Sequence, residues 1–558
     1  MKTTNTSAYK QPSTHGNKQK HRLIRILEIF GVFVFILLLF QFVFFYFANP
    51  ILRNAIKERI KENSNGLYSI DFETIRVSLG TRTIHLNDFK LSPNPEKYTE
   101  LKKQEKADKA LYAINFRKLT ISKIKLWKFI KTGNLEINRI MLERPLARII
   151  DLPPIEAKKK EKYDAVHRDL YPFISKSLNS LKIDSIEITD GYFDFFIQKD
   201  DSRMRSTVSN ISLKLNSFYL DSGTYKRHDR LFYSENIEVL IKNYVMGLKD
   251  NIHVLRAREV EISSEKSEIV IKKVSLLPEQ VQKRYFASIN TDFYDILVPE
   301  IKLANTDIIK MYFENELHIQ KVRLSEPRLK IIKNRERKKN SNKSGIRTQS
   351  LDLYTLMQGR LAELEVDSFV LKDASFEKYN HPSDTNPVNT VASLSIIFKR
   401  FRVDSLSHLN KEKFLYADDI DISMLDFNMR LADNRHRLKA KRLIFSTEQS
   451  QIIAEQVSLD PINNLIKSKN KSLFSIFVPA LIVSGAELKK AYNYKRLLVK
   501  ELILQNPHLG INSYANLKNK PSKTKKKKAV FFQKYLNILR KQNSFTLFFF
   551  LYQSQFQT

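Results

Sequence analysis

An internal repeat of about 180 residues limits the folds open to this chain more than any other feature of its sequence. The segment His318–Lys333 (HIQKVRLSEPRLKIIK) has counterparts at Leu135–Asp151 (LEINRIMLERPLARIID) and Leu498–Asn512 (LVKELILQNPHLGIN). The prolines of these three marker segments lie 182 (327 − 145) and 180 (507 − 327) positions apart. Similarity at a fixed period is typical of repeat proteins, in which each unit buries its apolar side against the next.

The repeated unit has the pattern of β-structure. Ser209–Pro278 matches Ala392–Pro461 without a gap, at an offset of 183. Apolar residues recur in the units at short spacing, which predicts strands with one apolar face. Each marker segment is predicted to form a strand, a tight turn at the proline and a second strand, where a ladder bends or ends. The residues predicted to line an apolar groove are Ile137, Ile140, Leu142, Ile319, Val322, Leu324, Leu502 and Leu504.

We therefore expect a mainly β fold, an elongated repeat array of antiparallel β-sheet units that form a groove, with short helices. A charged helix is expected at Glu96–Ala110, and short helices such as Thr306–Phe313 are expected before each marker segment. If roughly 35 strands stack at about 4.8 Å, the array reaches on the order of 170 Å.

A membrane anchor is predicted before the repeats. Ile29–Phe47 holds 19 residues without a charge, and a helix of that length is about 28 Å long, close to the ~30 Å hydrocarbon core of a bilayer. A cleavable signal peptide has a shorter core and small residues at its exit. The short basic N-terminus favours the cytoplasm for residues 1–25, although basic residues beyond the span nearly balance this comparison. A helix over residues 50–62 is expected to leave the membrane.

Composition excludes several classes of function. The chain has no Cys, which removes disulfides, thiolate catalysis and cysteine zinc sites, and its 12 Gly leave little material for phosphate-binding loops. No catalytic motif is present, so we expect no enzyme activity, cofactor or metal. His253 and His436 recur at one repeat position, as DNIH and DNRH; we interpret them as turn residues rather than ligands or bases, because Asp-Asn favours hairpins. The single Trp127 is expected to pack in a core.

The net charge of +35 indicates attraction to an anionic surface, either a membrane or a nucleic acid. Lys-rich runs follow the marker segments at Lys158–Lys162, Lys333–Lys343 and Lys518–Lys528. We interpret these runs as solvated loops, with contact to acidic lipid head groups as the alternative. Nucleic-acid binding is not expected, because base-stacking aromatic residues are not clustered with the runs.

The sequence divides into six parts. Leu547–Tyr552 are six consecutive apolar residues, too few to span a bilayer and too uniform for a strand with one solvated face. We therefore expect that 544–558 form no native strand pair, that the sheet ends in an exposed edge near Leu539, and that the chain is truncated or frame-shifted relative to a longer parent. The parts are 1–28 (cytoplasmic basic N-terminus), 29–47 (transmembrane helix), 48–164 (partial first β repeat), 165–346 (second repeat), 347–528 (third repeat) and 529–558 (truncated start of a further repeat with an aberrant tail).

The layout resembles the AsmA-like family of bacterial envelope proteins, the TamB- and YhdP-type proteins that belong with the bridge-like lipid transfer proteins. The resemblance rests on the apolar span, the strands YSIDFETIRVSL and TIHLNDFKL, and the phrase LWKFIKTGNLEINRIMLERPLARII, and it covers residues 20–150 best. It implies a single-pass protein of the bacterial inner membrane with its bulk in the periplasm. It also implies a hydrophobic β-groove for phospholipid acyl chains, or a role in outer-membrane assembly, without catalytic residues.

The sequence therefore favours two alternative functions. The first is a membrane-anchored, non-enzymatic envelope protein whose partners are the phospholipid bilayer and lipid acyl chains. The alternative is a structural stalk or adaptor that binds other envelope proteins through sheet edges. In the second case the apolar faces of the strands would be fully covered by protein.

Overall fold

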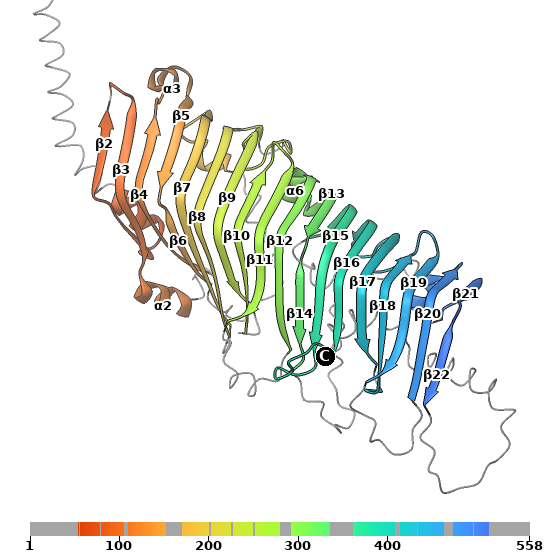
Figure 1. Ribbon diagram of the computed structural model, residues 1–558. Coiled ribbons are helices and arrows are strands. Elements are labelled where there is room, and N and C mark those ends of the chain that lie inside the picture. The colour runs from red at the N-terminus through yellow and green to blue at the C-terminus, as the bar shows by residue number, and fades with distance from the viewer. Residues whose placement is uncertain are drawn as a thin grey trace, which may run out of the picture.

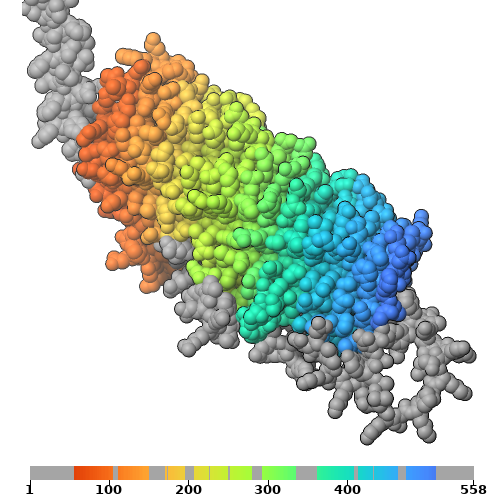
Figure 2. Space-filling view, in the orientation of Figure 1, coloured from red at the N-terminus to blue at the C-terminus, as the bar shows by residue number. Residues whose placement is uncertain are grey.

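The fold is one long sheet. In the computed structural model, the 22 strands belong to a single sheet, accompanied by short helices. The sheet is twisted, and its strands follow one another from end to end in the order of the sequence (Figure 1). The space-filling view shows an elongated body with the same progression (Figure 2). The predicted mainly β fold is confirmed. The structure describes residues 54, 56–78, 80–104, 110–151, 170–199, 202–224, 227–248, 252–279, 292–334, 361–407, 413–431, 433–462, 473–494 and 496–512.

The elements have the following bounds. The first strands are β1 (Tyr68–Asp71), β2 (Thr74–Ser78), β3 (Thr83–Pro93), β4 (Ala110–Ser122), β5 (Asn134–Glu143), β6 (Leu146–Asp151) and β7 (Ser180–Lys199). The next are β8 (Ser202–Asp221), β9 (Asn236–Gly247), β10 (His253–Ser263), β11 (Glu268–Pro278), β12 (Phe293–Thr306), β13 (Glu316–Ser325), β14 (Arg328–Ile332) and β15 (Glu363–Tyr379). The last are β16 (Asn389–Val403), β17 (Asp419–Arg430), β18 (His436–Ser446), β19 (Gln451–Pro461), β20 (Leu473–Ser484), β21 (Glu501–Gln505) and β22 (His508–Asn512). The helices are α2 (Pro95–Lys103), α3 (Leu126–Thr132), α4 (Tyr171–Ile174), α6 (Ile308–Glu314) and α8 (Leu488–Tyr494).

Four positions in the sheet are each filled by two strands that lie end to end. These are β1 with β2, β5 with β6, β13 with β14, and β21 with β22, because both members of each pair bond to the same neighbour. The 22 described strands therefore occupy 18 positions (22 − 4), which at about 4.8 Å each span roughly 80 Å. The described strands fill fewer positions than the roughly 35 of the sequence-based estimate, because long strands such as the 20-residue β7 each fill one position.

The sequence repeat is a repeat of strands. β9, β10 and β11 begin 183 positions before β17, β18 and β19. The helices α3, α6 and α8 begin at Leu126, Ile308 and Leu488, at intervals of 182 and 180. The units share one sheet, since β11 pairs with β12 and β19 pairs with β20.

Each marker segment forms two strands around its proline, as predicted, but the chain does not turn back between them. β13 and β14 both run antiparallel to β12 and parallel to β15, so the chain keeps its direction across Pro327. Glu326, with a φ of 51°, interrupts the strand. Pairing with β15 continues on both sides, because the Glu326 N–H donates to the Lys372 carbonyl and the Ser375 N–H donates to the Pro327 carbonyl, both at 2.8 Å. The proline thus marks a break in one strand, not a reversal of the chain.

The predicted antiparallel array is also corrected at two places. β7 runs parallel to β5 and β6, and β15 runs parallel to β13 and β14, whereas the other pairs of described strands are antiparallel. A parallel neighbour requires a crossover connection that returns the chain to the starting end of the strand. Lys158–Lys162 and most of Lys333–Lys343 belong to these connections and lie outside the described residues.

A line of irregular residues crosses the sheet near the middle of its strands, and we call it the mid-sheet seam. Residue pairs drop out of the register there, and β7–β8, β8–β9 and β15–β16 show the register shifts of β-bulges. Eleven residues of the seam have a φ between 41° and 59°. A bulge bends its strand and shifts the alternation of side chains by one. Asn and Asp, which tolerate this left-handed conformation best, hold seven of the eleven positions. The positive-φ residues of the seam are Asp88, Arg144, Asp190, Asn210, Asn243, Lys273, Glu326, Asp373, Asp426, Gln456 and Asn506.

The predicted helices are present with altered bounds. The charged helix, expected at Glu96–Ala110, is the shorter α2. It starts where the Asn94 side chain accepts hydrogen bonds from two backbone N–H groups, with Pro95 at its first position. α6 begins two residues later than predicted, because the Asp307 side chain caps it by accepting from the Lys310 N–H.

Several predictions fall outside the described residues. These are the span Ile29–Phe47, the domain boundaries at 164/165, 346/347 and 528/529, and the segment 529–558 with Leu539. Residues 56–63 are helical, and all but the last of them lie within the expected exit helix. Among the helices that the structure does describe, none combines the length and apolar character needed to cross a membrane.

Candidate functional site: an apolar face along the sheet

One side of the sheet is apolar, and β17 shows how its sequence builds this side. Ile422 and Met424 are buried on it, whereas Ser423, between them, points to the opposite side. The seam residue Asp426 shifts the alternation by one, so Phe427 is buried on the same side as Met424. We call this side the apolar face and the opposite side the outer face.

The apolar face continues across the sheet in two rows of directly paired residues. The first row runs from β3 to β17 through Leu86, Leu119, Leu142, Ile188, Leu213, Val239, Ile262, Ile269, Leu303, Val322, Phe369, Phe398 and Ile420. The second row runs from β8 to β21 through Ile211, Ile241, Val260, Ile271, Ile301, Leu324, Leu371, Ile396, Ile422, Phe445, Ile452, Val483 and Leu502. No polar residue interrupts either row.

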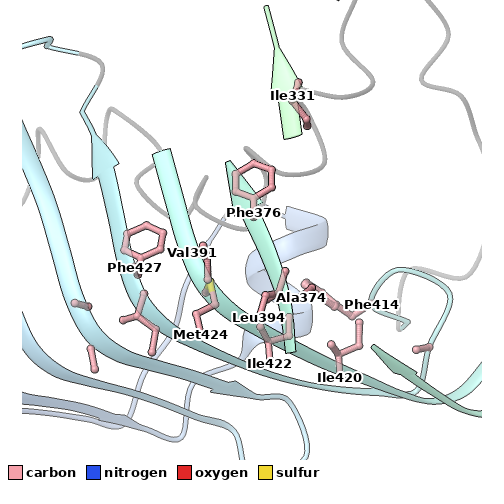
Figure 3. Close-up of a cluster of buried hydrophobic side chains, with 14 residues drawn as sticks. Ile331, Ala374, Phe376, Val391, Leu394, Phe414, Ile420, Ile422, Met424 and Phe427 are labelled. Carbon is pink, nitrogen blue, oxygen red and sulfur yellow. The ribbon is translucent and has the colours of Figure 1, made fainter. Parts of the chain in front are cut away.

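The apolar face is concave where it is most deeply buried. Figure 3 shows Leu394, Ile422, Met424 and Phe427 on the inner side of strongly curved strands. They belong to one cluster of buried residues, which includes side chains from both sides of the mid-sheet seam. Since bulges bend strands, the seam accounts for the curvature.

Only short elements cover the apolar face. Within the described residues all strands lie in one sheet and the longest named helix has 9 residues, so there is no second layer. α6 covers one part: Ile308 is buried, and the Tyr312 ring lies 4.8 Å from the Phe232 ring. α8 repeats this contact through Tyr492, whose ring is 4.6 Å from that of Phe414.

The first helix of this kind is uncovered. Trp127 and Ile130 of α3 are 78 % and 69 % exposed. The prediction that Trp127 packs in a core is therefore wrong. Trp127 is exposed because α3 lacks a cover that α6 has. The segment between β8 and β9 covers α6, and the described residues before α3 include no counterpart of that segment.

All eight predicted face residues lie on the apolar face, at equivalent positions of the three marker segments. Their burial differs with what lies beside them. Both flanks of β5 and β13 are occupied by strands, but β21 has a described neighbour on one side only. Ile137, Ile319 and Val322 are buried, Ile140, Leu142 and Leu324 are half-buried, and Leu502 and Leu504 are 52 % and 38 % exposed.

The outer face carries charged side chains in networks. Lys272 donates to Glu259 at 2.7 Å and to Glu261 at 2.5 Å, and these hydrogen bonds raise the pKa of Lys272. Near α3, hydrogen bonds from Lys125 and Lys128 hold the pKa of Glu136 at about 2. The outer face is therefore suited to water, and the two faces have opposite chemistry.

The two repeat-equivalent histidines have structural roles. His253 and His436 are buried at the starts of β10 and β18. Nε2 of His253 accepts a hydrogen bond from the Tyr294 N–H at 3.0 Å, and Nε2 of His436 accepts one from the Phe474 N–H at 3.2 Å. Nδ1 of His436 lies 2.6 Å from an Asp433 carboxylate oxygen. Through these hydrogen bonds, His253 fixes the start of β12 and His436 fixes the start of β20. Each histidine also lies next to a turn, as the sequence indicated.

One group of three potential metal ligands occurs in the described part of the chain, His318, Glu363 and Glu365 on the outer face. Nε2 of His318 is 3.6 Å from Glu363 and 3.8 Å from Glu365. Arg402 bonds to Glu363 at 3.0 Å. The Arg402 guanidinium thus already pairs with one carboxylate of this group. We interpret the group as an ion-pair network rather than as a metal centre.

Sequence reasoning found the apolar residues but missed how strand curvature is produced. An Asn or Asp inside an apolar run, as at Asn243 and Asp426, could have indicated the seam, because these residues tolerate the left-handed backbone conformation found there. The histidine contacts with Tyr294 and Phe474 had no signal at all, because they join residues about 40 positions apart. In comparison with known proteins, no family model matches this chain, and no curated protein shows detectable similarity to it.

Proposed function

We propose that this chain is a membrane-anchored, non-enzymatic protein whose apolar face holds the acyl chains of phospholipids and lets them move along the sheet. The observation that carries the proposal is the pair of unbroken apolar rows, which together cross the sheet from β3 to β21. A stretch of this length exceeds what packing one small core requires. Contiguous apolar surface in a groove is the usual mark of a lipid or ligand site.

The energetics favour such a face for lipid movement. Bringing a 16-carbon chain into water costs about 12 kcal/mol, at about 0.8 kcal/mol per CH₂. A lining of Leu, Ile, Val and Phe side chains removes most of that cost at every step. Because neighbouring strands are about 4.8 Å apart, successive residues of one row offer an acyl chain nearly equal contacts, so no single position traps it.

The membrane anchor in this proposal is Ile29–Phe47, with the sheet outside the bacterial inner membrane in the periplasm, as the AsmA-like resemblance implies. α3 supports a position close to the bilayer. Its exposed Trp127 and Ile130 lie on the same short helix as Lys128 and Lys131. Tryptophan and basic side chains are enriched at membrane surfaces, where one end of the residue is apolar and the other is wet.

Native mass spectrometry of the full chain released from its membrane tests the proposal. We expect phospholipid that stays bound after detergent removal. The matched variants are Leu324→Lys, which places a charge on the apolar face, and Arg323→Lys, which changes the adjacent outer-face residue. Leu324→Lys should reduce bound lipid and Arg323→Lys should not. Absence of lipid from the unmodified chain contradicts the proposal.

The second candidate function is a stalk or adaptor that binds envelope proteins through the edges of the sheet. Among the described strands, β21 and β22 pair on one side only, and this favours the alternative because the edge of a sheet can pair with another chain. The two functions differ in what contacts the apolar face. Under the stalk reading, photo-crosslinkers on that face label protein and never lipid.

A further inference from the structure

α3 differs from the helix at the same position of the next repeat, because no described residue covers it. Tyr312 of α6 packs against Phe232, which belongs to the segment between β8 and β9. Ile130 is the counterpart of Tyr312 at the repeat interval of 182 (312 − 130), and it is exposed. Trp127, three positions earlier, is exposed as well. Since residues i and i+3 of a helix are neighbours on its surface, α3 presents one open apolar side.

The charge of this segment also differs from that of its counterparts. Residues 123–132 hold four lysines and no acidic residue, a charge of +4. The equivalent residues 305–314 carry −1, from one Lys, one Asp and one Glu, and 485–494 carry +1, from two Lys and one Glu. Lys131 is exposed and has no acidic partner among the described residues. It follows Trp127 by four positions, so this cation and the apolar side chains share one side of α3.

The path of the chain directs its N-terminal helix toward the end of the strands that carries α3. Nζ of Lys57 lies 2.8 Å from an Asp71 carboxylate oxygen, so the helical residues 56–63 fold back along β1 and run opposite to it. β1 and β2 both lead toward the turn before β3. In that turn the Arg82 carbonyl accepts a hydrogen bond from the Ile124 N–H at 3.1 Å, next to α3. The start of the helix is therefore directed to the α3 end of the strands, opposite α2 (Figure 1), and the predicted span ends only seven positions before the described chain begins (54 − 47).

We propose that the open side of α3 docks on an anionic phospholipid bilayer, with Trp127 and Ile130 in the head-group region. Lys131 and Lys123 then bind the lipid phosphates. Tryptophan is favoured at this depth because its ring is apolar and its N–H can meet water, and lysines close to an anionic surface are attracted to it. The inference rests on the membrane anchor of the proposed function and names the element that touches the bilayer, but it does not require lipid movement along the sheet.

Tryptophan fluorescence tests the contact directly, because Trp127 is the only tryptophan of the chain and its emission reports on α3 alone. The full chain is reconstituted into vesicles of phosphatidylcholine and phosphatidylglycerol whose acyl chains carry bromine close to the head group, since bromine quenches tryptophan on contact. We expect blue-shifted emission, and quenching relative to vesicles without bromine. Both effects should weaken in vesicles of phosphatidylcholine alone and at high salt, because salt screens exposed charges.

Leu406 supplies a matched control position, because it is 71 % exposed where Trp127 is 78 % exposed, and it follows β16, far from α3 along the sheet. In the variant Trp127→Phe with Leu406→Trp, emission should stay unquenched. Lys131→Gln should lower the ratio of quenched to unquenched Trp127 about fivefold, which corresponds to the ~1 kcal/mol that one lysine contributes at an anionic surface. Lys439→Gln, which changes an exposed lysine of β18, should leave the ratio unchanged.

Three results overturn the proposal. One is emission from Trp127 in the anionic vesicles that is typical of water and is not quenched. Another is a blue shift without quenching by brominated lipid, which shows that protein covers α3. The third is equal quenching at positions 127 and 406, which shows that the contact is not made by α3 in particular. Quenching at position 127 without lipid on the apolar face supports this inference and removes the lipid-holding function, whereas lipid on the apolar face without quenching removes this inference alone.

Discussion

The two faces of this sheet are built by the same strands and are used in opposite ways. Met424 and Leu425 are neighbours in β17 and both are apolar. Met424 is 2 % exposed on the apolar face, and Leu425 is 40 % exposed on the outer face. The difference teaches that the direction of a side chain, set by the pleat and by the mid-sheet seam, decides burial more than the residue type does.

The largest expected effect comes from a charge placed on one face or the other. Ile422→Asp should lower the free energy of unfolding of the surrounding strands by about 4 kcal/mol, because it removes buried apolar contact and buries a carboxyl group without a partner. Ser423→Asp, on the outer face, should change it by less than about 0.5 kcal/mol. Native-state hydrogen exchange of the β17 amides measures both. Equal losses would show that the faces are not distinct.

Truncation of the two neighbours separates direction from hydrophobicity. We expect Met424→Ala to cost about 3 kcal/mol, since it opens a cavity in a closely packed cluster. Leu425→Ala should cost less than about 1 kcal/mol, because its side chain already meets water. The same exchange measurement applies. A larger loss for Leu425→Ala would contradict the assignment of faces.

A smaller, pH-dependent effect is expected at the turn before β18. Burial would raise the pKa of Asp433, but hydrogen bonds from the His436 side chain and from two backbone N–H groups outweigh burial and lower it. A carboxyl group with a depressed pKa stabilises the fold above its unfolded pKa of about 3.9, and this contribution is lost as the pH falls through the folded pKa.

Asp433→Asn should therefore be less stable than the unmodified chain at pH 6, by on the order of 1 kcal/mol, and the difference should shrink toward pH 3. Thermal unfolding at a series of pH values measures it. Ser423→Asn, at an outer-face position without a titratable group, is the control and should show no such convergence. A difference that stays constant with pH would remove Asp433 from the account.

The smallest expected effect is that of Trp127→Ala in α3, which is compared with Tyr312→Ala in α6, the helix at the same repeat position. Tyr312→Ala should cost about 2 kcal/mol, because the Tyr312 ring packs against Phe232 and Phe313. Trp127→Ala should stay within about 0.5 kcal/mol, since Trp127 is exposed. Hydrogen exchange in the strand after each helix compares them. A larger loss of stability for Trp127→Ala than for Tyr312→Ala would contradict the exposure of Trp127.

Much of the apolar face could be predicted from the sequence. The sequence pattern places Ile319, Val322 and Leu324 on one face, and their equivalents in the other marker segments follow from the repeat interval. The face can be predicted because alternation along a strand indicates which residues share a face. The repeat added a second test, since a face residue in one unit should be a face residue in the next.

The course of the chain could not be predicted in the same way. Pro327 indicated a turn, because proline removes a ladder hydrogen bond in a turn and in a break alike. Whether the chain reverses there depends on the register with β12 and β15, which are far away in sequence. The parallel direction of β15 was hidden for the same reason: alternation along one strand carries no information about the direction of its neighbour.

The central claim, that the apolar face receives lipid, is tested most directly by site-specific photo-crosslinking in membranes that contain the full chain. A photoreactive apolar residue replaces Leu324 on the apolar face or Arg323 beside it on the outer face. The account predicts a covalent phospholipid adduct at position 324 and none at position 323. No lipid adduct at position 324, or equal adducts at both positions, would contradict it.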